Sequence, residues 1–131
     1  MLKHLITELC QQFQLPMNLE INPQGYYEVS VNDTTNLIFK ELNPGFSCRS
    51  ILAPVPQKPT EDLFILLMKA NFLGQGTKGS CIAIDDSVQN FLFTLSVPEE
   101  INYRLFKEKL EEFINYLEYW RKRIHDEILQ K

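Results

Sequence analysis

The stretch DLFILLMKANFL, residues 62–73, is apolar on nearly every side when it is wound as a helix of about 3.6 residues per turn. Its two apolar faces consist of Leu63, Leu66, Leu67 and Ala70, and of Phe64, Ile65, Met68 and Phe72. A surface helix needs only one apolar stripe, whereas a helix that is apolar all round is covered on both sides. A sheet can cover one face of this helix, so the question that the sequence raises is what covers the other face.

Two alternatives are possible for what covers the second face of this helix. A chain of 131 residues suits a single domain, residues 1–131, with one core, and its own long C-terminal helix can cross over the face. A second chain can cover it instead. The second alternative is favoured because closed two-fold dimers are the commonest soluble oligomers, and Met and Phe are enriched in interface cores.

The flanking patterns predict the order α-β-β-β-α-β-β-α. A first helix with one apolar face ends before Pro16, and alternating segments at 17–21, 27–31 and 37–42 read as strands joined by short turns. Residues 46–52 are either a further strand or an irregular return. After three prolines between 54 and 59, Thr60 caps a helix that runs from 61 to 72 or 73 and ends near Gly74.

The second half continues with strands at 80–84 and 91–97. A long final helix opens at 98–100 and runs to 129, with its apolar stripe on Phe106, Leu110, Phe113, Leu117, Trp120, Ile124 and Ile128. That stripe is too short for a coiled coil, so we expect the helix to pack across the sheet. The sequence therefore predicts an α+β fold, a mostly antiparallel, twisted sheet packed by three helices.

Composition excludes several classes of function. The 17 acidic and 13 basic residues give a net charge of −4, which argues against nucleic acid as a partner. No run of apolar residues approaches the roughly 18 that a membrane span needs, so no membrane insertion is expected. Nor does the N-terminus resemble a secretory signal. Cys10, Cys48 and Cys81 fit no metal-ligand spacing and are expected as buried or half-buried thiols in a reducing compartment.

No motif predicts catalysis, a cofactor or a metal ion. Gly74, Gly76 and Gly79 spell GxGxxG, but the segment follows a helix instead of a strand, so it fails the dinucleotide pattern. His4 and His125 lie near opposite ends of the chain, and Asp85-Asp86 is typical of a turn. We therefore expect a protein that binds other proteins and is not an enzyme.

At this point the sequence resembles a known family, the class I chaperones of bacterial type III secretion, the Tir chaperone family. The helix end LLMKAN at 66–71 is similar to that family's LLxxAN pattern, and the strand CIAIDD at 81–86 is similar to its apolar strand ended by acids. The strand FLFTL at 91–95 and the C-terminal helix with Trp120 continue the likeness over essentially the whole chain. The proline-rich loop at 54–59 and the long final helix depart from the pattern.

The resemblance implies a cytoplasmic bacterial protein that dimerises through the second helix and a neighbouring strand. It implies that the dimer binds, without ATP, the extended N-terminal segment of a secreted effector or gate protein and keeps it secretion-competent. The residues expected at the dimer interface are Phe64, Ile65, Met68 and Phe72. The residues expected to line the client-binding groove are Leu5, Leu9, Phe13, Met17, Leu19, Tyr27 and Phe39.

Two other functions stay open. The first is a regulatory adaptor of the same fold that forms a heterodimer with another small chaperone-like protein, because an apolar face need not be self-complementary. The second is a small enzyme or ligand-binding domain, which a tightly bound small molecule in the purified protein would indicate.

Overall fold

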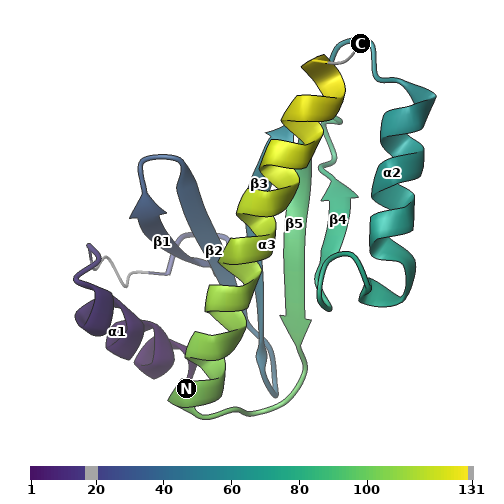
Figure 1. Ribbon diagram of the computed structural model, residues 1–131. Coiled ribbons are helices and arrows are strands. Elements are labelled where there is room, and N and C mark those ends of the chain that lie inside the picture. Colours follow the sequence, from purple (N-terminus) through teal and green to yellow (C-terminus); the bar gives the residue numbers. More distant parts are fainter. Residues whose placement is uncertain (17–20, 130–131) are drawn as a thin grey trace. The chain divides into compact units, whose positions relative to one another are not determined.

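The computed structural model describes residues 1–16 and 21–129 (Figure 1). The elements are α1 Leu2–Phe13, β1 Tyr27–Asn32, β2 Thr35–Glu41, β3 Phe46–Pro54, α2 Glu61–Asn71, the 3-10 turn η1 Phe72–Gly74, β4 Cys81–Ile84, β5 Asn90–Val97 and α3 Tyr103–Leu129. The strands form one antiparallel sheet in the order β1-β2-β3-β5-β4. The predicted α+β class and element order are confirmed. None of the described helices is both long and apolar enough to cross a bilayer.

Of the two alternatives left open for residues 46–52, the structure takes the strand, which is part of the nine-residue β3. Two other elements differ from the prediction. Of the strand predicted at 17–21, residues 17–20 lie outside the described residues, and Ile21 is in no strand. Helix α3 begins at Tyr103 instead of 98–100, because the Asn102 side chain accepts the Leu105 N–H at 2.9 Å, as an N-cap does.

The chain divides into two compact units, which are described separately: unit 1 is Met1–Ser50 with Ser96–Leu110, and unit 2 is Ile51–Leu95 with Glu111–Lys131. In unit 1, Tyr27 of β1 lies opposite Phe39 of β2, and Val29 lies opposite Leu37. These side chains are buried, and the Phe39 ring packs near Phe46 and Phe106, with centroids 5.1 to 6.2 Å apart within the trio. The core of unit 1 is therefore an aromatic cluster that joins β2, β3 and the start of α3.

The first turn of α1 is held by a carboxylate from β2. The Leu2 N–H donates to Glu41 Oε1 at 3.0 Å, and this hydrogen bond and the amino group of Met1 lower the pKa of Glu41 below its usual 4.5.

A carboxyl whose pKa is lowered by folding stabilises the folded state above its unfolded pKa and loses that contribution as the pH falls. We expect the stability of the protein to fall below about pH 4.5 and Glu41→Gln to flatten that slope, measured by denaturant unfolding across the pH range. A Glu41→Gln slope equal to that of the unaltered protein would contradict this role. The side chain is half-exposed, so the effect is small.

In unit 2, β4 pairs antiparallel with β5, and Ile82 lies opposite Phe93. Helix α2 lies beside β4 (Figure 1). The Thr60 side chain accepts the Leu63 N–H at 3.2 Å, and the acids Glu61 and Asp62 occupy the first turn, so the predicted start of this helix is confirmed.

Helix α3 holds the glycine-containing loop and β3 in unit 2. Trp120 donates its indole N–H to the Gly76 carbonyl at 2.8 Å, and Arg121 donates to the carbonyls of Ile51 and Leu52 at 2.7 and 3.2 Å. The predicted stripe of α3 is buried along its length as far as Ile124, while Ile128, one residue before the last described residue, is exposed.

The cysteines follow the prediction at two of three positions. Cys10 and Cys48 are buried, and burial raises the pKa of each thiol, which disfavours the reactive thiolate form. Cys81 is exposed, contrary to the prediction, because successive strand residues alternate between faces and its neighbour Ile82 takes the buried side.

Candidate interaction surface

Helix α2 presents an uncovered apolar face. Its inward side is buried through Leu63, Leu67 and Ala70. On the outward side the exposed fractions are 41% for Ile65, 73% for Met68 and 63% for Phe72. Helix α3 does not cover these side chains, which excludes the alternative that the chain's own C-terminal helix shields the second face.

One of the four expected interface residues is mainly internal. Phe64 is half-buried, and its ring packs edge-on against Phe91 of β5, with centroids 6.3 Å apart. It therefore supports α2 from within unit 2, and the exposed apolar area lies on the other three.

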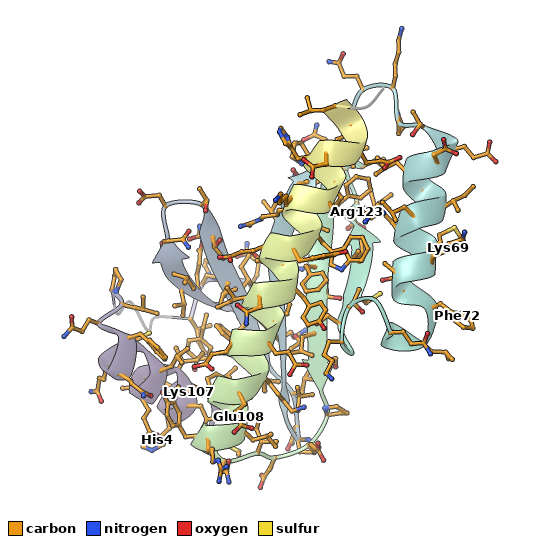
Figure 2. All side chains as sticks on the ribbon, viewed as in Figure 1. His4, Lys69, Phe72, Lys107, Glu108 and Arg123 are labelled. Carbon is orange, nitrogen blue, oxygen red and sulfur yellow. The ribbon has the colours of Figure 1, made fainter. Side chains whose placement is uncertain are left out.

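Leu73 adds to this face and was missed by the sequence pattern, which placed it at a helix end. It is 80% exposed and lies in η1 with φ 53° and ψ 21°, a left-handed conformation that residues other than glycine rarely adopt. We call Ile65, Met68, Phe72 and Leu73 the α2 patch. Figure 2 shows Phe72 at the end of α2, on the side turned away from β4. The nearby Gly74 and Gly76 were the signal that the helix turns here.

The residues expected to line a client groove are brought together only in part. Four of them belong to the core of unit 1, with Phe39 completely buried: Leu5, Leu9, Tyr27 and Phe39. Phe13 is 45% exposed, and the Lys107 ammonium lies 5.5 Å from its ring centroid (Figure 2 labels Lys107 on α3). Met17 and Leu19 lie outside the described residues.

Each unit has one further feature of note, a hollow in unit 1 and a hydrogen-bonded turn in unit 2. An open hollow of about 400 Å³ in unit 1 is lined mostly by polar groups and the turn at residues 42–45, with Glu41 and Glu100 at its rim. In the turn before β5, the Asp85 carboxylate accepts hydrogen bonds from Ser87, Gln89 and Asn90. Among the described residues, no three His, Cys, Asp or Glu side chains gather as a metal site would require.

Comparison with known proteins identifies the family. The model of the Tir chaperone protein (CesT) family matches residues 4–121, which is most of the chain. The chain therefore belongs to the Tir chaperone family. A protein of Chlamydia pneumoniae is 25% identical over 122 residues, which cover 92% of this chain and 93% of that protein.

Solved structures share the fold at low identity. A chain of the ExsC–ExsE complex matches with a TM-score of 0.76 at 13% identity, covering 92% of this chain and 91% of that one. A chain of the HopA1–SchA chaperone–effector complex matches with a TM-score of 0.67 at 15% identity and covers 92% of each chain. A chain of the heterodimeric ExoU–SpcU complex from the type III secretion system of Pseudomonas aeruginosa matches with a TM-score of 0.66 at 15% identity, covering 90% and 92%.

Proposed function

We propose that this protein is a cytoplasmic type III secretion chaperone that pairs with a second copy through the α2 patch. The pair binds the N-terminal segment of a secreted effector or gate protein, and it acts by equilibrium binding without ATP and without catalysis. The observation that carries the proposal is the exposed apolar α2 patch on a chain of the Tir chaperone family.

The patch has the properties of a subunit interface. Ile65, Met68 and Phe72 are spaced three and four residues apart, so they form one stripe along α2. Contiguous exposed apolar patches on soluble proteins mark interaction sites, and methionine and phenylalanine are enriched at interface cores. A single such stripe suits a two-fold dimer, in which the same surface of both copies meets.

Unit 1 is the proposed place for the client. Strand β1 is one of the two terminal strands in the sheet order and the one in unit 1. An extended segment gains affinity by adding to a sheet edge while alternate side chains enter pockets. Phe13 offers an exposed ring at the end of α1. The four buried residues expected in the groove, Leu5, Leu9, Tyr27 and Phe39, would contact a client only if the structure around them rearranged.

The proposal is tested on the partner that co-purifies with the untagged protein from its own cells. That partner is produced with and without its N-terminal segment, and binding to the chaperone is measured by calorimetry in the presence and absence of ATP. We expect binding that needs the N-terminal segment and is indifferent to ATP. Equal binding after removal of the segment would contradict the client proposal, and a second small chaperone-like chain as the partner would favour the regulatory heterodimer.

A further inference from the structure

The last residue of α2 makes a paired contact with β4. The Asn71 side chain donates its amide N–H to the Ile82 carbonyl at 2.8 Å and accepts the Ile82 N–H at 2.7 Å. An asparagine side chain carries both an acceptor and two donors. It can therefore form hydrogen bonds with both the N–H and the carbonyl of one residue, as the backbone of a neighbouring strand does. This contact fixes where α2 ends relative to β4 within unit 2.

The chain turns sharply just beyond that contact, in a segment that we call the α2 corner, residues 71–76. Its backbone is closed by the Gln75 N–H on the Phe72 carbonyl and by the Gly76 N–H on the Ala70 carbonyl, both at 3.1 Å. A Cβ on Gly76 would lie 2.8 Å from the Ala70 Cα, so the two backbones touch. The corner is thus held by the contact of Asn71 with β4 and by the close approach of Gly76 to Ala70.

The corner carries half of the α2 patch, including Leu73, its most exposed side chain. Phe72 and Leu73 lie on it, and Met68 lies one turn before it. Leu73 adopts a left-handed conformation that costs energy, and because its side chain is 80% exposed, the backbone contacts of the corner and not side-chain packing hold it there. Strained backbone that is over-determined by its surroundings is typical of sites that are preorganised for a ligand.

We infer that Asn71 is a positioning residue for the subunit interface, which holds the α2 corner so that Met68, Phe72 and Leu73 meet a second copy as one preorganised surface. This inference rests on the proposed pairing and adds to it how the surface is held. Without the amide contact, these side chains would become ordered only when the two copies bind. The entropic cost of that ordering would lower the affinity of pairing.

The test measures the dimer dissociation constant of the full chain by sedimentation for the unaltered protein, Asn71→Ala and Asn71→Asp. We expect Asn71→Ala to weaken pairing by about tenfold or more, since three side chains become free to move. Asn71→Asp keeps the acceptor for the Ile82 N–H but turns a carboxylate oxygen toward the Ile82 carbonyl, and because these two acceptors repel, it is expected to weaken pairing at least as much as Asn71→Ala. Amide hydrogen exchange is expected to speed up at Ile82 and Leu73 and to stay unchanged at Phe93.

The matched control is Ile124→Val, which removes one buried methyl group from α3 in the same unit and leaves the corner untouched. We expect it to lower stability and leave the dissociation constant within about twofold. The inference is overturned if Asn71→Ala leaves pairing unchanged, or if Ile124→Val weakens pairing as much. An unaltered protein that is monomeric contradicts the proposed pairing itself, whereas a dimer indifferent to Asn71 contradicts this inference alone.

Discussion

Replacing Met68 and Phe72 together by glutamate is expected to convert the proposed dimer into a folded monomer. Both side chains are more than 60% exposed in the single chain, so the change costs little of its stability. In the dimer the same change removes two apolar contacts and buries unpaired charge. Central interface residues contribute about 2 kcal/mol or more each, so pairing is expected to weaken by at least about 100-fold, measured by sedimentation.

The control for this prediction is Leu129→Glu, the same kind of change at an exposed leucine near the end of α3 and outside the α2 patch. It is expected to leave the dimer intact. A Met68→Glu and Phe72→Glu protein that still pairs as tightly as the unaltered chain would show that the partner surface lies elsewhere.

Gly45→Ala is expected to have the largest effect on stability in unit 1. Gly45 has φ +96°, and a Cβ there would lie 1.8 Å from the Val97 carbonyl oxygen and 2.7 Å from the Glu99 nitrogen. Both neighbours are backbone atoms, so relief requires the turn or the segment after β5 to move. We expect a loss of about 4 kcal/mol or more, a large part of the total stability of a domain, measured by denaturant unfolding.

Gly25→Ala separates the clash from the backbone conformation. Gly25 also has a positive φ, of +87°, but nothing lies within 4 Å of an added Cβ. Gly25→Ala is therefore expected to lower the free energy of unfolding only by the cost of a left-handed backbone for alanine, about 1 to 2 kcal/mol. If both variants lose the same stability, the close approach of Gly45 to Val97 is not what holds this turn.

The fold was predictable where one periodicity dominated. Three patterns were each typical of one kind of secondary structure: the apolar stripe from Phe106 to Ile124, the Thr60 cap and the alternation along β5. The start of α3 was placed too early, because Glu99 and Glu100 are good first-turn residues while the cap is made by Asn102, two residues later. Local propensity does not say which of several capping groups the tertiary fold selects.

The interaction surface was predictable in outline only. The two-faced helix indicated an uncovered face, and the exposure of Ile65, Met68 and Phe72 agrees with that reasoning. Leu73 was missed because its left-handed backbone depends on contacts between Ala70 and Gly76 that no short pattern encodes. Apolar periodicity likewise does not distinguish groove from core, because buried Phe39 and exposed Phe13 each lie on the predicted apolar face of their element.

The central claim is that the α2 patch is covered by a second copy of the chain. Native mass spectrometry of the untagged protein, purified from its own cells, tests it most directly. The account predicts a mass of twice 15.4 kDa, alone or together with part of one larger protein. A bare 15.4 kDa chain at every concentration, or a pair of two unlike small chains, would contradict it.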